Sequence, residues 1–393
     1  KVKETAGNFP DGPFLDLFSG MCAVAHSVHP NRNIWCNDVQ FFASFVAKAF
    51  FKSQSLPPTS IDAAFATQED YRENFAKLQN RFESDLNEEI TLLNKKNVNN
   101  IKSFYTILPH IGNSQNMLKT RNWLYYKPKT FPYRLFSITY AGGYFGLKQC
   151  LQIDSIRYAI DFLLSNNKIT KENHLWMLLA LCEAISKSST STGHFAQYLT
   201  INSNNKCYYL EQRNKSIWNE WLKAVDSLCP VGEKSWRINN RVYRTDANKL
   251  LNSFLKTAFE PSIVYADPPY TDDQYSRFYH IYETLILYDY PKSVGKGRYR
   301  ENRYSSSFSL KSLVYKSFED LIKSVSGLKC SFILSYPTNG LIPESEKELL
   351  SLIKNYFRKA EIVYRISHKH SSLGASKGYE KYSVEELLYL GRN

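Results

Sequence analysis

The sequence predicts an α/β fold with a doubly wound, mostly parallel sheet that a long insertion interrupts. Two strand–turn–helix units follow one another in residues 13–28 and 33–50, and the pattern returns at residues 241–254 and 262–270. Strands that alternate with helices in this way form a parallel sheet with crossover helices. We therefore expect one sheet that is assembled from both ends of the chain.

The first two units show the pattern most clearly. In PFLDLFSGMCAVA (13–25) the apolar run ends at Leu17, and Ser19–Gly20 make a turn before a helix of small apolar residues. In residues 33–50 the strand ends at Asn37–Asp38, and apolar side chains then recur with the period of a helix. These side chains are Val39, Phe42, Phe45, Val46 and Phe50.

The rest of the chain divides into a core and an insertion. Residues 51–146 and 191–239 lose the strand–helix pattern and become polar or basic, so we expect them to form an inserted region. The core is expected to comprise residues 1–50 and 240–393, with the apolar helices near 147–190 packed on it.

The last part of the chain is predicted to form strands. Residues 330–343, 360–366 and 382–390 contain apolar runs that would close the sheet, the last of them as an antiparallel strand. On the apolar helix near residue 155, Asp154 and Arg157 are three residues apart, which favours a structural ion pair.

Basic residues outnumber acidic ones, with 50 Lys and Arg against 37 Asp and Glu in 393 residues and a formal net charge of +13. Such an excess favours a polyanionic partner. The seven cysteines are scattered without a C-x-x-C pair, so we expect no disulfide framework, no zinc site and a reducing cytoplasmic compartment. No segment resembles a signal peptide or reaches the roughly 20 apolar residues that span a bilayer.

Two stretches concentrate the positive charge. Residues 91–153 contain no Asp or Glu, and residues 291–316 contain only Glu301. Because Lys and Arg neutralise phosphates and aromatic rings stack on exposed bases, such stretches are typical of a nucleic-acid groove. A solvated basic face is the alternative for either stretch. The candidate DNA contacts are Lys127, Lys129, Arg134, Arg298, Arg300 and Arg303.

Four acidic residues lie within or after predicted strands, namely Asp16, Asp38, Asp246 and Asp267. The carboxyl ends of parallel strands border the ligand site of an open sheet, and a carboxylate after the second strand is placed to hold a ribose diol. LFSGMCAVA has a single glycine and lacks the G-x-G-x-x-G pyrophosphate fingerprint, which favours S-adenosylmethionine over a dinucleotide. In the alternative interpretation, Gly20 merely closes a turn.

The tetrapeptide DPPY, residues 267–270, follows a short apolar strand. Two consecutive prolines cannot continue the ladder and keep the backbone extended. The Asp267 carboxylate and the Pro268 carbonyl would then form a rigid pair of acceptors for the exocyclic amine of an adenine that gains a methyl group. Tyr270 would stack on the ring of a base that is flipped out of its duplex at a cost of about a few kcal/mol. A proline-terminated surface strand is the alternative.

DPPY, together with FLDLFSG (14–20) and ND (37–38), resembles the Dam-type family of adenine-N6 DNA methyltransferases, which use S-adenosylmethionine. The motif order, with a long insertion before DPPY, is similar to the alpha group of that family. The resemblance implies a Rossmann-like methyltransferase sheet and a target recognition region within the insertion. It also implies site-specific methylation of a flipped-out adenine in double-stranded DNA by a nucleoid-associated cytoplasmic protein, with a restriction or defence-system protein as a candidate partner.

The resemblance also assigns roles to residues of this sequence. The residues implied to bind the cofactor are Asp16, Leu17, Phe18, Ser19, Gly20, Asp38, Val39, Asp246 and Asp267. In this set Asp38 would take the ribose hydroxyls, Val39 would pack against the adenine, and Asp246 would accept from the adenine amine. The residues implied to hold or border the target base are Asp267, Pro268, Pro269, Tyr270 and Tyr275.

Other functions are compatible with the same fold. Methylation of cytosine N4, RNA adenine or a protein amide is one alternative, although the families that resemble this sequence and catalyse those reactions usually carry Ser or Asn in place of Asp267. A DNA-binding subunit with an inert methylase fold is another. Against it, the acidic, glycine and tyrosine residues of both motifs are all present.

Overall fold

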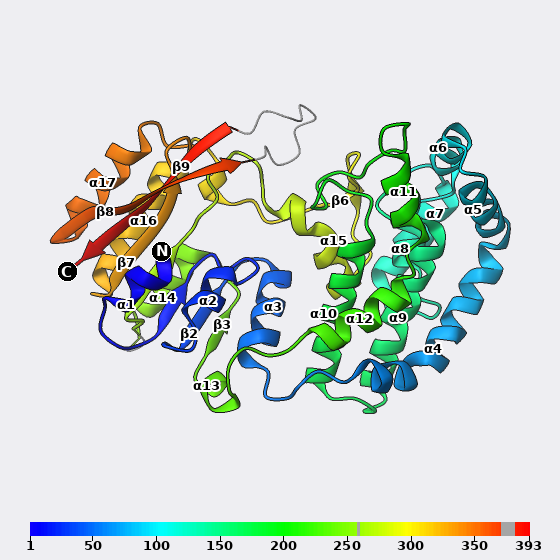
Figure 1. Ribbon diagram of the computed structural model, residues 1–393, viewed down its shortest axis with the longest axis horizontal. Helices are drawn as coiled ribbons and strands as arrows, with labels where there is room; N and C mark the ends of the chain where they lie inside the picture. The colour runs from blue at the N-terminus through cyan, green and yellow to red at the C-terminus, as the bar shows by residue number, and fades with distance from the viewer. Residues whose placement is uncertain (258–259, 371–381) are drawn as a thin grey trace. The chain divides into compact units, whose positions relative to one another are not determined.

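The computed structural model describes residues 1–257, 260–370 and 382–393 (Figure 1). They form two compact units, each made of separate chain segments. The first unit comprises Lys1–Gln54, Pro230–Ser276 and Tyr304–Asn393, and the second comprises Ser55–Cys229 and Arg277–Arg303. Within the described ranges, no helix has the length and apolar character that crossing a membrane requires.

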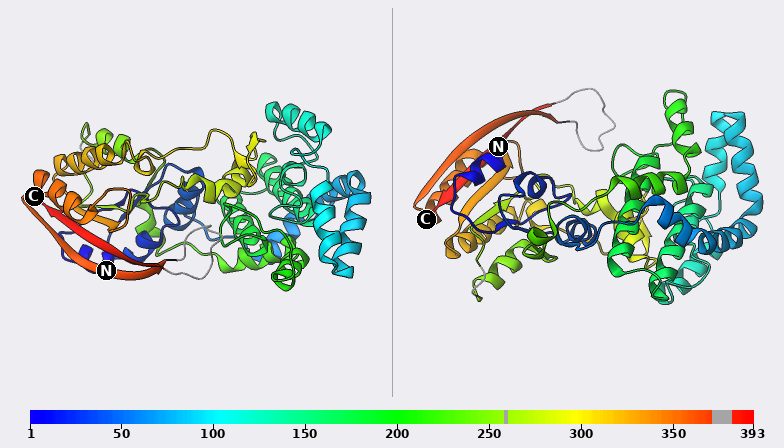
Figure 2. Two further views of the ribbon diagram at one scale, coloured as in Figure 1. Left: turned by 90° about the horizontal axis from the view of Figure 1, so that it is seen from above. Right: turned by 60° about the horizontal axis from the view of Figure 1, so that its bottom comes forward.

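The first unit is built on a sheet whose described strands are arranged in the order β3-β2-β1-β4-β7-β9-β8. The strands are β1 (Phe14–Asp16), β2 (Ile34–Asn37), β3 (Arg241–Tyr243), β4 (Ile263–Ala266), β7 (Ser331–Pro337), β8 (Lys359–His370) and β9 (Tyr382–Arg392). The first five pair in parallel, and β9 pairs antiparallel with both β7 and β8. The predicted doubly wound, mostly parallel sheet with an antiparallel C-terminal strand is therefore confirmed. β8 and β9 run side by side at one edge of the sheet (Figure 2).

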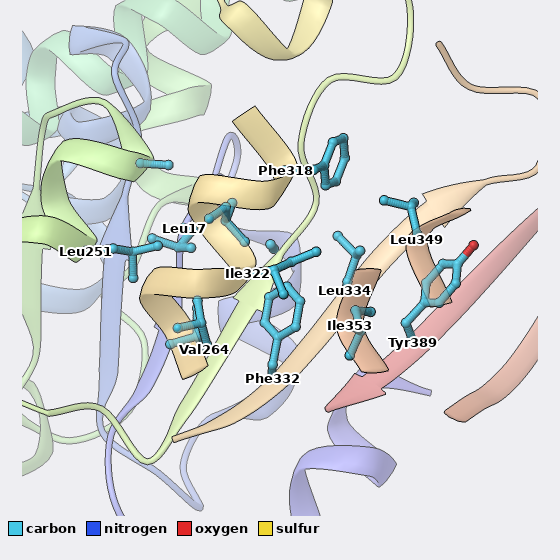
Figure 3. Packing of buried hydrophobic residues seen from close by; sticks show 14 of the residues in the cluster. Leu17, Leu251, Val264, Phe318, Ile322, Phe332, Leu334, Leu349, Ile353 and Tyr389 are labelled. Carbon is cyan, nitrogen blue, oxygen red and sulfur yellow. The ribbon is translucent and has the colours of Figure 1, made fainter. Parts of the chain in front are cut away.

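Helices cover this sheet because their apolar residues recur on one side. The helices of the unit are α1 (Val2–Gly7), α2 (Ala23–Val28), α3 (Phe41–Lys52), α13 (Lys234–Ile238), α14 (Ala247–Phe254), α16 (Val314–Gly327), α17 (Ser345–Tyr356) and the 3₁₀ turn η1 (Ser307–Ser309). In α16, Phe318 and Ile322 are four residues apart and join one buried cluster with Val264 and Phe332 of the sheet (Figure 3). Residues of α14 and α17 belong to the same cluster.

The sheet is buried on both faces. Leu15 of β1 and Trp35 of β2 belong to the cluster, whereas their strand neighbours Phe14 and Ile34 are fully buried outside it. Because successive side chains of a strand point to opposite faces, both faces must be covered, as a doubly wound fold requires.

The second unit is helical apart from one short hairpin. Its helices are α4 (Ser60–Arg81), α5 (Glu83–Lys95), α6 (Val98–Ile107), α7 (Gln115–Tyr126), α8 (Leu135–Thr139), α9 (Leu147–Ser165), α10 (Lys171–Ser188), α11 (Lys206–Asn214), α12 (Ile217–Ser227) and nearly all of α15 (Ser276–Leu287). The hairpin pairs β5 (Ser293–Val294) with β6 (Tyr299–Arg300). α9 packs against α4, α8, α10 and α12, so it forms the centre of the unit.

The unit boundaries differ from those expected from sequence. The helices near 147–190 were expected on the sheet, but α9 and α10 lie in the second unit. Residues 230–239 were expected in the insertion but belong to the first unit, and residues 277–303 were expected in the core but belong to the second. A helix that is apolar on all sides needs neighbours on all sides, and here other helices supply them.

The expected ion pair between Asp154 and Arg157 is replaced by other contacts. Asp154 is fully buried and accepts hydrogen bonds from the backbone N–H groups of Phe136 (2.9 Å) and Ser137 (2.8 Å) and from the Tyr288 hydroxyl (2.6 Å). Arg157 pairs with Asp161 one helical turn further on. Asp154 thus fixes the start of α8 to α9 and to the segment after α15.

Replacement of Asp154 should destabilise the second unit. Asp154→Ala leaves several buried donors without an acceptor, which should lower the free energy of unfolding by about 3 kcal/mol. Chemical denaturation monitored by circular dichroism measures this loss. Glu69→Ala, at an exposed position of α4, is the matched control and should have little effect. Equal stability of the two variants would contradict the assigned role.

Candidate active site

The site lies in the first unit, where the carboxyl ends of β1 and β4 meet. β1 and β4 are parallel neighbours in which Asp16 is level with Tyr265, and the Leu17 N–H donates to the Tyr265 carbonyl at 3.0 Å. The chain leaves β1 toward β2 on one side and has β4 on the other, so this edge is the topological switch point of the sheet. Asp16 therefore ends β1, and Asp267 directly follows the neighbouring strand β4.

Asp38 organises the turn after β1. Its carboxylate accepts from the Gly20 N–H at 3.0 Å and from the Gln40 N–H at 2.8 Å. Gly20 has φ of +46°, a conformation that glycine adopts without the steric cost of a side chain. Burial raises the pKa of Asp38, and the donated hydrogen bonds oppose that rise. Asp38 thus joins the β1 turn to the start of α3, and its expected ribose contact stays a prediction.

Asp16 is a buried carboxylate with spare hydrogen-bonding capacity. Its side chain is 1% exposed, and its Oδ1 atom has no hydrogen-bond partner. Burial, followed by the nearby charge of Asp267, raises the pKa of Asp16 to about 8. The buried Ser19 hydroxyl beside it also lacks a partner. Unpaired acceptors at a buried, acidic strand end fit a cationic ligand with N–H donors, which is the character of the methionine end of S-adenosylmethionine.

Asp267 is exposed at the end of β4, and the residues after it are held in place. Pro268 is buried, Tyr270 is half-buried, and the Tyr270 carbonyl accepts from the Leu341 N–H at 3.1 Å. The Tyr270 ring meets the Tyr275 ring edge-on at 6.4 Å. Neighbouring protein atoms remove part of the hydration of Asp267 even though it is exposed, and this loss and the Glu386 carboxylate raise its pKa to about 7. The tetrapeptide therefore presents a carboxylate near its titration midpoint beside an ordered aromatic ring.

Glu386 is a site residue that sequence reasoning missed. It lies on β9 opposite Pro337 of β7, and the Ser335 hydroxyl donates to its carboxylate. After burial, its negative charge is a further cause of the raised pKa of Asp267 and, more weakly, of Tyr270. The available signal was a pair of charged residues inside the apolar run SVEELLYL, but only the antiparallel pairing of β9 brings one of them to the site.

Asp246 has a structural role in addition to the cofactor contact expected for it. It caps α14 by accepting from the Lys249 N–H at 3.1 Å, and its second oxygen accepts from the Tyr304 hydroxyl at 2.7 Å. Burial and this carboxylate raise the pKa of Tyr304. A cofactor adenine amine would share these oxygens with Tyr304, and this contact stays a prediction. Phe18 is half-buried against Phe308 at 5.2 Å, edge to face.

The six candidate DNA contacts all lie in the second unit, and some are held by protein partners. Arg298 is 9% exposed and donates to the carbonyls of Thr139 and Ala141, so its guanidinium is part of the interior. Arg300 forms a bidentate pair with Asp289 at 2.6 and 2.7 Å.

The remaining candidates are more accessible. Arg303 and Arg134 are half-buried, Lys127 is exposed, and Lys129 is exposed with Asp161 at 3.3 Å. The lysines at the end of α7 are therefore better placed for a phosphate than Arg298, whose N–H groups already serve the fold.

Asp16 should make the stability of the protein depend on pH. Its carboxyl group loses its proton near pH 4 in the unfolded chain but near pH 8 in the folded protein, so the folded state binds that proton more tightly. The contribution of Asp16 to the free energy of unfolding should therefore decline as pH rises from about 4 to about 8. Asp16→Asn should remove this decline and raise the melting temperature at pH 8 but not at pH 4. Asp320→Asn, on α16 with a side chain that is 46% exposed, is the control, and an unchanged melting temperature of Asp16→Asn at pH 8 would contradict the effect.

We expect the negative charge of Glu386 to raise the pKa of Asp267. Glu386→Gln removes a negative charge but keeps a hydrogen-bonding group beside Ser335, so the pKa of Asp267 should fall below about 7. A ¹³C NMR titration of the Asp267 carboxyl carbon measures the shift. Glu385→Gln is the neighbouring control, because that carboxylate pairs with Arg365 at 3.3 Å. A similar pKa of Asp267 in both variants would show that Glu386 does not act on it.

The chain matches a family of known proteins over most of its length. Residues 3–335 match the model of the D12 class N6 adenine-specific DNA methyltransferases. The chain is 27% identical over 249 residues to modification methylase LlaI of Lactococcus lactis subsp. lactis, covering 63% of this chain and 36% of that protein. It is 24% identical over 401 residues to modification methylase StsI of Streptococcus sanguinis, covering 100% of this chain and 50% of that protein.

A further relative is the type II methyltransferase M.FokI of Planomicrobium okeanokoites, with 25% identity over 347 residues, 87% of this chain and 43% of that protein. The chain thus spans about a third to a half of the length of these relatives. The family match, in contrast, extends over most of the chain and includes both strand ends that form the site. The chain therefore belongs to the D12 class of N6 adenine-specific DNA methyltransferases.

Proposed function

We propose that this chain transfers a methyl group from S-adenosylmethionine to the N6 amine of an adenine that is flipped out of double-stranded DNA. The observation that carries the proposal is the junction of β1 and β4. There, Asp16, whose buried carboxylate has an Oδ1 atom without a hydrogen-bond partner, ends β1, and the DPPY segment follows the adjacent parallel strand β4. Membership of the D12 class and the modification methylases among the relatives support the same reaction.

The residues of the first unit would hold the cofactor on the β1 side of this junction. Asp16 and Ser19 offer unpaired acceptors, and the turn at Gly20 lets a ligand approach the backbone. Asp38 and Asp246 would serve the ribose and the adenine. S-adenosylmethionine, when bound, supplies a methyl group on a positively charged sulfur, and the acidic surroundings of Asp16 favour that charge.

The DPPY segment would act on the target base. Asp267 and the Pro268 carbonyl accept hydrogen bonds from the two N–H groups of the amine, which favours positive charge on nitrogen as the new bond forms. Tyr270 stacks on the ring and orients it. With a pKa near 7, Asp267 can also take the proton that the methylated amine releases and pass it to solvent, because its carboxylate is exposed.

The second unit is the proposed target recognition region. Trp123, Tyr125 and Tyr126 of α7 are exposed, and the Lys127 ammonium lies 6.0 Å from the Trp123 ring centroid. Exposed rings beside cations suit contacts with bases and phosphates. Since the relatives are modification methylases, we propose a restriction enzyme or other defence-system protein as the functional partner.

Methyl transfer should depend on both Asp267 and Tyr270 of the DPPY segment. Transfer of tritium from labelled S-adenosylmethionine to unmodified duplex DNA should fall at least a hundredfold in Asp267→Ala, because the amine loses its charged acceptor. Tyr270→Ala should retain cofactor affinity but lose most turnover. Asp320→Ala on α16 is the control variant.

Identification of the modified base separates the alternatives. Digestion of the product and mass spectrometry should find N6-methyladenine. N4-methylcytosine as the product, label in RNA only, or no transfer despite cofactor binding would each overturn the proposal.

A further inference from the structure

The second unit contains a cavity of about 320 Å³ that has no assigned role. The cavity is lined by α6, residues 110–112, Gly142, the stretch from Tyr198 to Ile201, α11 and the β5–β6 turn. Its size lies at the lower end of the range for small-molecule sites. All of its lining residues belong to the second unit, so the cavity is separate from the β1–β4 junction of the first unit.

The cavity is cationic. Lys102 of α6, Lys296 of the β5–β6 turn and Arg298 line it, and none of the described residues that line it is an Asp or Glu. Both lysines are exposed, so their ammonium groups can move toward a ligand. An anion would therefore meet three positive charges in the cavity and no carboxylate.

Arg298 is built into the wall of this cavity. Its hydrogen bonds to the Thr139 carbonyl (2.5 Å) and the Ala141 carbonyl (3.0 Å) leave its charge without a carboxylate partner, and its guanidinium lies 5.7 Å from the Tyr198 ring centroid. Its φ is +52°, a strained conformation for a side chain of this size. Strained backbone conformations are common at binding sites, where the surrounding structure maintains them.

His110 also lines the cavity. Its Nε2 lies 3.2 Å from the Arg298 guanidinium, and burial together with that charge lowers its pKa to about 4. The imidazole is therefore neutral at pH 7, and its Nδ1 accepts from the Gly112 N–H at 2.9 Å. It adds neither a positive nor a negative charge to the cavity.

Tyrosine rings provide the remaining walls. Tyr105 and Tyr209 line the cavity, and the buried Arg213 guanidinium lies 5.0 and 4.7 Å from their ring centroids, so this cation helps to hold both rings in place. Tyr198 adds a third ring. Fixed aromatic rings beside cations match a planar base that carries a phosphate.

We propose that this cavity binds a nucleotide, with its phosphate on Lys102 and Lys296, near the positive charge of Arg298, and its base among the tyrosine rings. The nucleotide could be a unit of the DNA substrate or a free nucleoside monophosphate, since both present the same groups. This inference does not depend on methyl transfer by the first unit.

Photolabelling tests the site directly. 8-Azidoadenosine 5′-monophosphate is irradiated with the whole chain in the presence of saturating S-adenosylhomocysteine, and labelled peptides are mapped by mass spectrometry. The label should fall within residues 98–112, 198–213 or 295–299. The nucleoside 8-azidoadenosine, which lacks the phosphate, should label these segments far less. Label confined to the first unit, or equal labelling by the nucleoside, would overturn the proposal.

A charge-matched pair of variants adds a second criterion. Lys102→Gln with Lys296→Gln should reduce labelling roughly tenfold, which corresponds to about 1.4 kcal/mol of binding free energy. Lys77→Gln with Lys171→Gln removes the same charge from exposed positions of α4 and α10 outside the cavity and should not reduce it. Equal labelling of the two double variants would contradict the site.

Competition identifies the source of the nucleotide. If unlabelled duplex DNA displaces the probe, the cavity holds a nucleotide of DNA, and if only free nucleotide displaces it, the ligand is a soluble nucleotide. Asp267→Ala should lose methyl transfer but keep the labelling, so failure of the proposed enzyme activity and failure of this cavity are distinguishable.

Discussion

The parallel pairing of β1 with β4 is the constraint on which the site depends. It joins residues near the start of the chain to residues beyond position 260, and it brings Asp16 and the segment after β4 to one edge of the sheet. Both strands are fully buried, so a shift in register would move apolar side chains out of the core and separate the two carboxylates. The position of the reactive groups is thus set by the same packing that stabilises the sheet.

This arrangement brings several carboxyl groups together at a site where ionisation is energetically unfavourable. Asp16 and Asp38 have raised pKa values chiefly because they are buried, and Asp267 is raised further by Glu386. A protein selected for stability alone would replace such groups, since an unpaired buried carboxylate lowers the free energy of unfolding. The proposed ligand, which brings a positive charge and N–H donors, would account for their presence at one strand edge.

The helical unit shows why net charge is a coarse guide to binding. Arg157, Arg213 and Arg298 belong to a chain with a large excess of basic residues, but each is buried and donates to carbonyl oxygens or pairs within the unit. Lysines on α6, near the end of α7 and in the β5–β6 turn are, in contrast, exposed. Composition predicts an anionic partner, whereas burial decides which cations can meet it.

The sequence by itself determined the strand–turn–helix units, the mostly parallel sheet and the DPPY segment, because these follow from local apolar patterns and from the backbone limits of proline and glycine. Only the tertiary structure placed Glu386 beside Asp267, gave Asp154 its hydrogen-bond donors and assigned α9 and α10 to the helical unit. Each of these depends on contacts between residues that are far apart in the chain. Periodicity shows that a side chain or a helix face is buried, but the partner that buries it is chosen by the packing of the whole unit.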